Sequence, residues 1–390
     1  MKKFGLMIAL GIFASLMVLS PTVANAQDEK QTELERNFYD ACYTKKDMTT
    51  CLTLAKELKG KYPTSTYIKY ADGQIKKDKS DKFQNALTAF YNGPDAPKLD
   101  QLVANAEDYL TVETGDTAVA YIVTRVALAT SYGVMGGIYK DADKAKSFSE
   151  RALKAMANET APQGWDAKDY TPLRDTTLAQ LNQFLGYQIL QASGSPEQAV
   201  EYLNKAIAVK HKDGLGWKDP NNYFLRSNAT FQEYQKLSKE YQALSDDQKT
   251  GDAGKAVLAK INPTIDKMLA DYARVLATAT KPETKVLKDG AKEQFDQFWK
   301  YRTGSDAGAA EFVKAFEADP TVPGPTVPAK AETSDTPAAG APPAGSANAP
   351  KLTTAVSANS STGTASTEKA GGKAAPAKGK AAPAKRKPRR

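Results

Sequence analysis

The apolar side chains of this chain recur at helical spacing from Thr32 to about Phe316, and this periodicity constrains the fold more than any other feature. One stripe lies at offsets 0, 3, 4, 7 and 11 and comprises Leu99, Leu102, Val103, Ala106 and Leu110; another comprises Phe231, Tyr234, Leu237 and Tyr241. Such offsets place side chains on one face of an α-helix. No segment shows the sustained alternation of a half-buried strand. The sequence therefore predicts an all-α protein.

Short breaks punctuate these helical segments. They are rich in Gly, Pro, Asn and Asp, which favour turns: Tyr62-Pro63, Asn92-Gly93-Pro94, Gly115-Asp116, Ser193-Gly194-Ser195-Pro196, Asp219-Pro220 and Thr280-Lys281-Pro282. Ser195 is suited to cap a helix that begins at Pro196, with Gln198 closing a capping box. Because loops this short favour antiparallel neighbours, we expect consecutive helical hairpins. Residues 159–173, which include Trp165 and Pro172, are expected to form a longer loop.

Small and large apolar residues also repeat in a fixed order. Leu185-Gly186 is followed by Ile189 and then by Ala199, Leu203 and Ala206; a weaker copy runs Tyr132-Gly133, Ala145, Ser149 and Ala152, and a third ends Cys51, Ala55, Leu58 and Pro63. The pattern resembles the tetratricopeptide repeat (TPR), in which small residues let the two helices of a hairpin approach closely. The resemblance implies a TPR-like helical-hairpin solenoid over residues 27–320. An ordinary helical bundle with coincidental Ala spacing is the alternative.

A TPR array usually binds a peptide along its concave face, with the first helix of each hairpin. In the best copy the inward positions that the resemblance implies are Gln180, Gln183, Tyr187 and Gln191. These side chains are polar and uncharged, and Gln amides offer both a donor and an acceptor to an extended backbone. The resemblance therefore implies a partner-binding stripe here. The alternative is an ordinary solvated helix face.

Cys42 and Cys51 are the only cysteines of the chain. In the repeat register Cys51 takes a small-residue position that faces the first helix of its hairpin, and Cys42 lies near the matching position opposite. That arrangement brings the two Cα atoms within the range that a disulfide requires. We therefore expect a Cys42–Cys51 disulfide, with two buried thiols as the alternative.

The N-terminus has the three parts of a secretory signal peptide. Lys2 and Lys3 precede an apolar run from Phe4 to Leu19, which is followed by the small-residue pattern Ala24-Asn25-Ala26. The run is shorter than the ~20 residues that span a bilayer. Residues 1–26 are therefore predicted to be cleaved after Ala26, leaving an exported protein, periplasmic or secreted, in a compartment where disulfides form.

The C-terminal part has a different composition. Residues 321–390 hold 18 Ala, 10 Pro and no aromatic residue, and they carry 11 Lys or Arg against 3 Asp or Glu. Such a segment buries too little apolar surface to fold, so we expect disorder. Residues 321–350 are predicted to be a Pro/Ala-rich linker, and residues 351–390 a basic tail. The basic tail suits anionic envelope polymers or lipid headgroups, or serves only solubility.

Composition also restricts the chemistry that the chain can perform. One His, His211, and one close Cys pair cannot build a His-based triad or a zinc site, and neither a cofactor nor a metal is predicted. His211 is expected at an exposed helix end. Gly251-x2-Gly254-Lys255 lacks the spacing of a phosphate loop and is interpreted as a helix start.

The leading hypothesis is a non-enzymatic exported scaffold or adaptor that binds a protein or peptide on its helical surface. Two alternatives stay open. One is an envelope polysaccharide hydrolase that uses two carboxylates. The other is a structural protein that binds polyanions through its basic tail.

Overall fold

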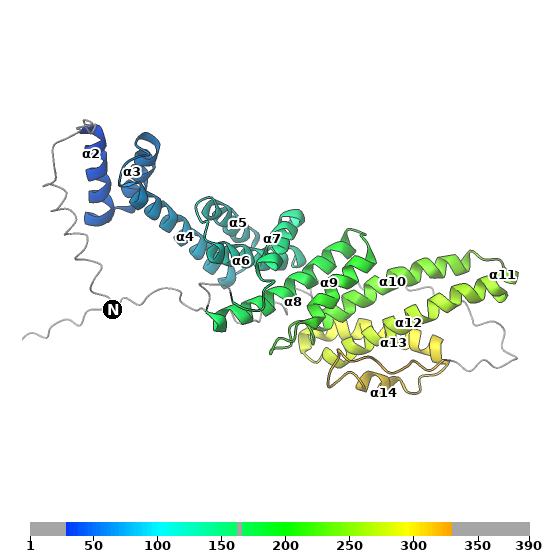
Figure 1. Ribbon diagram of the computed structural model, residues 1–390. Helices are drawn as coiled ribbons and strands as arrows, with labels where there is room; N and C mark the ends of the chain where they lie inside the picture. The colour runs from blue at the N-terminus through cyan, green and yellow to red at the C-terminus, as the bar shows by residue number, and fades with distance from the viewer. Residues whose placement is uncertain (1–28, 162–165, 330–390) are drawn as a thin grey trace, which may run out of the picture. The chain divides into compact units, whose positions relative to one another are not determined.

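The computed structural model describes residues 29–161 and 166–329 of the chain (Figure 1). Within these residues there are α-helices, one π-helical turn, one 3-10 turn and no strand, apart from an isolated bridge between Lys210 and Gly216. The all-α prediction is confirmed for this part of the chain. The elements are α2 (Glu29–Tyr39), η1 (Asp40–Thr44), α3 (Met48–Lys61), α4 (Ile68–Asn92), α5 (Ala96–Leu110), α6 (Asp116–Met135), α7 (Ala142–Ala155), α8 (Ala167–Gln191), α9 (Pro196–Ala208), α10 (Pro220–Gln242), α11 (Asp246–Thr250), α12 (Asp252–Thr278), η2 (Pro282–Thr284), α13 (Lys285–Thr303) and α14 (Ala309–Lys314).

The predicted breaks lie at helix ends or between helices. Side chains cap the start of several helices. Asp47, Asp141, Ser195 and Asp219 precede α3, α7, α9 and α10, and each accepts a hydrogen bond from a first-turn backbone N–H. Pro196 and Pro220 follow two of these caps at the first helical position, where no backbone donor is lost. Gly251 directly precedes α12, so the glycine motif around it is a helix start.

The described chain divides into two compact units, and the division falls within α4, α5 and α6. We call residues 29–90 and 100–122 the N-terminal unit, and residues 91–99, 123–161 and 166–329 the C-terminal unit. In the N-terminal unit α2, η1, α3 and the start of α4 enclose one apolar cluster, which includes Phe38, Cys51, Leu58 and Ala71. Phe83 of α4 also packs beside Tyr109 of α5, with ring centroids 6.1 Å apart.

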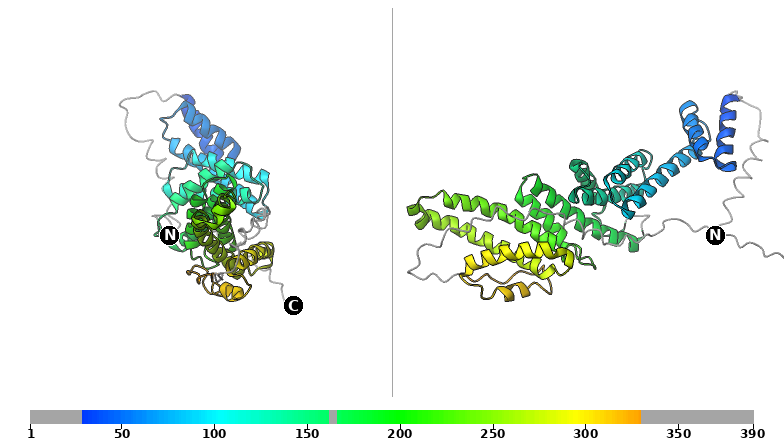
Figure 2. Two further views of the ribbon diagram at one scale, coloured as in Figure 1. Left: turned by 90° about the vertical axis from the view of Figure 1, so that its right-hand side faces the viewer. Right: turned by 180° about the vertical axis from the view of Figure 1, so that it is seen from behind.

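The C-terminal unit is built by consecutive packing. α8 packs on α9, α9 on α10, α10 on α12, and α12 on α13 and α14. The long helices α10 and α12 run side by side, as Figures 1 and 2 show from opposite sides. Their apolar faces join those of α13 and α14 in one large cluster, around Tyr234, Ile265, Phe298 and Trp299.

Gly186 sets the distance between α8 and α9. A Cβ atom at this position would lie 2.8 Å from Cγ of Leu203 and 3.2 Å from the carbonyl oxygen of Ala199. Real side chains do not pack so closely, so only glycine allows this approach. Gly133 of α6 is equally crowded, but there the nearest atom is Cδ2 of Leu99, at 2.3 Å, and belongs to α5.

Two predicted boundaries are wrong. The loop expected over 159–173 is shorter, because Asp166 caps α8 and Pro172 lies inside that helix. The body also continues past residue 320. Val327 is only 6% exposed, and a Cβ atom at Gly324 would lie 2.6 Å from the Phe316 ring. Residues 317–329 therefore form a strap along the C-terminal unit, so residues 321–329 of the predicted linker belong to the folded body.

Several predictions lie outside the described residues. They are the signal peptide over 1–26, Trp165, and the linker and tail from residue 330 onward.

Candidate functional site

The predicted stripe on α8 does not form a continuous exposed row. Gln183 is 1% exposed, and its side-chain amide donates to Oδ2 of Asp219 at 2.8 Å and to Oδ1 of Asn222 at 3.0 Å. Tyr187 is half-buried beside the cluster that α8 forms with α9 and α10, and burial raises the pKa of its hydroxyl. Gln180 is half-buried and Gln191 is exposed. The expectation of a solvent-facing stripe is therefore wrong at Gln183, which holds α8 to the start of α10.

Asp219 is the centre of that contact. Its carboxylate also accepts from the backbone and side-chain nitrogens of Asn221, at 3.0 and 2.9 Å. Burial raises the pKa of Asp219, while the donors from Gln183 and Asn221 act to lower it. Because the carboxylate caps α10 and is surrounded by protein donors, its role is structural.

The loop before Asp219 corrects the expectation for His211. This residue is 8% exposed, not at an open helix end, and its Nδ1 accepts from the backbone N–H of Asp213. The loop is closed by Gly216, whose φ is +80° and whose Cβ would lie 2.5 Å from two carbonyl oxygens. Trp217 then donates its indole N–H to the carbonyl of His211.

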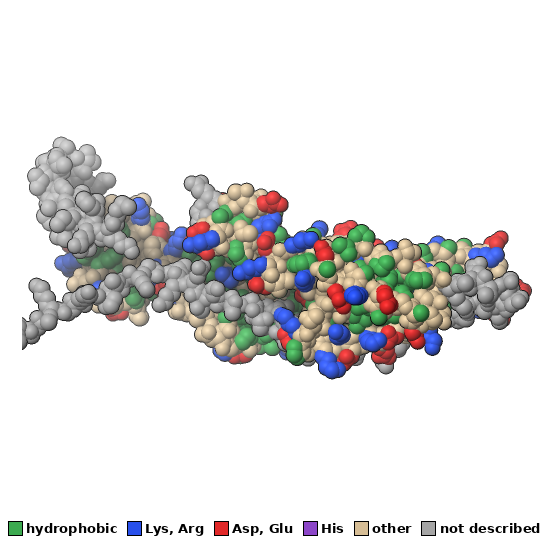
Figure 3. Space-filling view, turned by 90° about the horizontal axis from the view of Figure 1, so that it is seen from below, with side chains coloured by type: hydrophobic (Ala, Val, Ile, Leu, Met, Phe, Trp, Pro, Cys, Tyr) green, Lys and Arg blue, Asp and Glu red, His purple; other side chains and the backbone are tan. Residues whose placement is uncertain are grey.

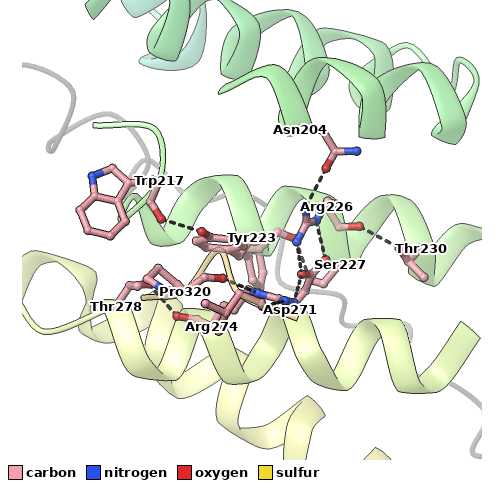
Figure 4. Close-up of polar contacts among 12 residues, drawn as sticks. Asn204, Trp217, Tyr223, Arg226, Ser227, Thr230, Asp271, Arg274, Thr278 and Pro320 are labelled. Carbon is pink, nitrogen blue, oxygen red and sulfur yellow. Dashed lines mark hydrogen bonds and ion pairs between the residues drawn. The ribbon is translucent and has the colours of Figure 1, made fainter. Parts of the chain in front are cut away.

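A second buried polar cluster joins α9, α10, α12 and the strap (Figure 4). Asp271 accepts from Nε and Nη2 of Arg226 at 2.9 and 2.6 Å, and from Nη1 of Arg274 at 3.1 Å. The other nitrogens are also engaged: Arg226 donates to Asn204, and Arg274 donates to the carbonyls of Pro320 and Val322. Every nitrogen of both guanidinium groups therefore has an acceptor within the protein, and Arg274 holds the strap in place.

The N-terminal unit carries the disulfide. Cys42 in η1 and Cys51 in α3 are joined, with their Cα atoms 4.8 Å apart. Cys42 lies in the π-helical turn that follows α2, and Asp47 caps α3 four residues before Cys51. The bond closes the first hairpin beside Tyr43.

Four tyrosines gather next to this disulfide, and we call them the tyrosine cluster: Tyr39, Tyr43, Tyr67 and Tyr70. Tyr39, Tyr43 and Tyr70 are 49%, 42% and 55% exposed, which is unusual for large apolar side chains of the described chain. The ring centroids of Tyr39 and Tyr43 are 5.2 Å apart, and those of Tyr67 and Tyr70 are 6.0 Å apart.

Two further contacts connect these pairs. Gln74, one turn after Tyr70 on α4, donates its amide to the Tyr43 hydroxyl at 3.1 Å. Burial raises the pKa of Tyr67, and Glu35, Tyr39 and Tyr70 lie near enough to raise it further. The rings of α2 and η1 therefore form one surface with those at the start of α4.

Two carboxylates near the tyrosine cluster have donors within the protein. Asp40 accepts from Lys45 at 2.7 Å, which lowers the pKa of this aspartate. Glu35 is buried and accepts from Ser65 at 2.6 Å and from Gln31 at 2.8 Å. A surface with exposed ring faces and hydroxyl groups suits ligands that stack on aromatic rings and exchange hydrogen bonds.

The tyrosine cluster is not among the sequence-based predictions, although the sequence holds a signal for it. Tyr39 and Tyr43 are four residues apart and Tyr67 and Tyr70 are three apart, which are the spacings of helix neighbours. The same spacings occur in core stripes, so periodicity alone does not distinguish exposed rings from buried ones.

The rest of the described chain offers few other sites. Between residues 29–161 and 166–329, no group of three or more His, Cys, Asp or Glu side chains is arranged to hold a metal ion. In the same residues α6 is the one helix long and apolar enough to cross a membrane, and 56% of its apolar window is buried within the protein. Acidic and basic side chains are interspersed over the face drawn in Figure 3.

Comparison of the chain with protein-family models, with curated proteins and with solved structures gives no match.

Proposed function

We propose that the protein is an exported, non-enzymatic scaffold or adaptor that binds a protein or peptide on a TPR-like helical surface. The observation that carries the proposal is the tyrosine cluster. Tyr is enriched among the residues that dominate binding energy, because a rigid ring contributes a large contact area and a hydrogen-bonding hydroxyl. Three such rings stay exposed, on α2, η1 and α4, and two of them lie beside the disulfide in sequence.

The TPR-like part of the proposal is supported by helix packing. In the best copy of the pattern, Gly186 and Ala199 occupy the small-residue positions where α8 and α9 touch. In the third copy, Cys51, Ala55 and Leu58 of α3 are fully buried against α2 and α4. In this register α2 and α4 are first helices of successive hairpins, the helices that line the binding face of a TPR array.

The proposed binding surface thus moves from α8 to α2 and α4. The amide side chains of α8 no longer support the proposal, because the Gln183 amide is hydrogen-bonded to Asp219 within the fold. Export is supported by the disulfide, because disulfides persist in oxidising compartments. A periplasmic or secreted location remains part of the proposal.

The buried carboxylates favour binding over the hydrolase alternative. Two catalytic carboxylates must face one substrate across a cleft. In the described residues, the buried or capping acids lie on different elements, and each is engaged by its own donors: Glu35 by Ser65, Glu113 by Lys76, Asp219 by Gln183 and Asp271 by Arg226. These contacts give each carboxylate a structural role.

Selection from a random peptide library on the immobilised mature protein tests the proposal. We expect selected peptides to bind the wild type and to bind the Tyr39→Ala, Tyr43→Ala, Tyr70→Ala triple variant at least about 30-fold more weakly, as for loss of a hot spot. Tyr91→Ala is the matched control, since Tyr91 is also on α4 and is 40% exposed. Equal binding to the triple variant, or release of sugars from envelope polysaccharide by the protein, would overturn the proposal.

A further inference from the structure

We propose that formation of the Cys42–Cys51 disulfide assembles the tyrosine cluster, so that the reduced chain lacks the binding surface and the oxidised chain presents it. The surface is that of the proposed function, on which this inference rests, and the disulfide adds the condition under which the surface exists. All the residues concerned belong to the N-terminal unit.

The disulfide lies inside the segment that presents two of the exposed rings. Cys42 directly precedes Tyr43 and follows Tyr39 by three residues. Cys42 is 7% exposed and Cys51 is fully buried in the cluster of α2, α3 and α4, whereas about half of the Tyr39 and Tyr43 side chains is exposed. The bond therefore joins the turn that carries these rings to the buried part of α3.

Few other features hold this turn in its observed conformation. Within η1, Ala41 and Cys42 are the buried residues, and the Ala41 side chain is a single methyl group. Lys46, which follows the turn, has a φ of +56°, in the left-handed region that disfavours residues other than glycine. The ion pair between Asp40 and Lys45 is exposed, and exposed pairs contribute little to stability. Such a segment opens locally at low cost when no covalent bond closes it.

Tyr43 links the two halves of the tyrosine cluster. Its ring lies against Tyr39, and its hydroxyl accepts a hydrogen bond from Gln74 of α4. Opening of η1 removes both contacts, and with them the connection between the rings of α2 and those of α4. Tyr67 and Tyr70 contact each other at the start of α4 and keep their positions. The reduced chain therefore retains only the α4 half of the cluster.

Thiol–disulfide exchange with an oxidant that carries a disulfide forms the bond. The Cys42 thiol, on the turn that opens, loses its proton, and its thiolate attacks one sulfur of the oxidant and expels the other as a thiolate. The Cys51 thiolate then attacks the Cys42 sulfur of the mixed disulfide and releases the second oxidant sulfur. Two electrons pass from the two cysteines to the oxidant, which ends as two thiols that have taken up the two protons.

Oxidation thereby couples partner binding to export. In a reducing compartment the two thiols persist, and the apparent affinity for a partner falls with the fraction of chains in which the turn is closed. In an oxidising compartment the bond closes the turn, and the three exposed rings are presented together. The chain then binds its partner only where disulfides form.

Hydrogen exchange of the full mature chain, followed by peptide mass spectrometry, tests the closure of the turn. The compared forms are the oxidised wild type, the wild type held in dithiothreitol, and the Cys42→Ala, Cys51→Ala variant, which keeps small side chains at both positions. We expect exchange over residues 40–47 to become at least about tenfold faster in the last two forms. Residues 68–80 of α4 are the internal reference, and their exchange should change less.

Leu58→Ala is the matched control, because it removes a fully buried side chain from the same cluster and leaves the disulfide in place. It should accelerate exchange across α2, α3 and the start of α4 together. An unchanged rate over residues 40–47 in the forms without the disulfide would overturn the inference. Acceleration that is spread evenly over the unit, as in the control, would also overturn it.

Peptide binding separates this inference from the proposed function. Peptides selected on the oxidised wild type should bind both disulfide-free forms at least about tenfold more weakly. Equal binding by all three forms refutes the oxidation requirement and leaves the proposed function intact. If no selected peptide binds the oxidised wild type, the proposed function fails, while the exchange rates still decide whether the disulfide closes the turn.

Discussion

Replacing Asp271 by Ala should destabilise the C-terminal unit more than any exposed charge substitution. The Asp271 side chain is 5% exposed, and its two arginine partners are 19% and 11% exposed. Removing the carboxylate leaves two guanidinium groups in a largely dry environment with only part of their acceptors. Breaking a buried ion pair in this way costs about 3–5 kcal/mol. Because Asn204 and the carbonyls of Pro320 and Val322 still accept hydrogen bonds, we expect the lower value, about 3 kcal/mol.

Urea unfolding at pH 7 measures this cost. Trp217 and Trp299 both lie in the C-terminal unit, so tryptophan fluorescence reports on its unfolding. With a slope of about 1–3 kcal/mol per M, the midpoint should fall by about 1–3 M. Asp296→Ala is the control, because it breaks an exposed pair with Lys292 and should change the stability by less than about 1 kcal/mol. A midpoint for Asp271→Ala no lower than that of the control would refute the reasoning.

Three further changes test other contacts. Gly186→Ala should cost about 1–3 kcal/mol in the same urea assay through overpacking, whereas Gly73→Ala, which has no atom within 4 Å of the added Cβ, should be neutral or slightly stabilising. The native protein should show no free thiol on titration after unfolding without a reductant, and reduction of Cys42–Cys51 should lower the free energy of unfolding by about 2–3 kcal/mol. Burial acts to raise the pKa of Glu113, but its hydrogen-bond donors outweigh burial, and the pKa is lowered from 4.5. Glu113→Gln should therefore lower the free energy of unfolding by about 1–2 kcal/mol at pH 7. This difference between wild type and variant should shrink as the pH falls through and below 4.5.

Helices and their ends were predictable because their signals are local. Asp219-Pro220 predicts a helix start whatever packs beside it, and the structure begins α10 at Pro220. The strap was not predictable in this way. Val327 is one apolar residue in a proline-rich segment, and its burial depends on Phe316 and Gly324, which fold the chain back on itself.

The site could not be located from periodicity. Gln183 has the spacing of a solvated face, and its burial is decided by Asp219 and Asn222, which come from a helix almost forty residues later. The rings of Phe231 and Tyr234 have the spacing of Tyr67 and Tyr70, yet both of the former are core residues. What separates the two pairs is the presence of covering helices. Helices α12 and α13 cover Tyr234, and the spacing of residues in the sequence does not show which helices cover a ring.

The surroundings of the tyrosine cluster are compatible with the binding surface that we propose there. An exposed tyrosine gains little from burial in the free protein, so its contact area remains available for a ligand. The loss of side-chain freedom on binding is small when neighbours already restrict the ring. Here the disulfide fixes the backbone at Cys42, Gln74 holds the Tyr43 hydroxyl, and Tyr39 lies against Tyr43. The first hairpin thus combines a small core with ordered rings, an arrangement that favours ligand binding over further packing within the chain.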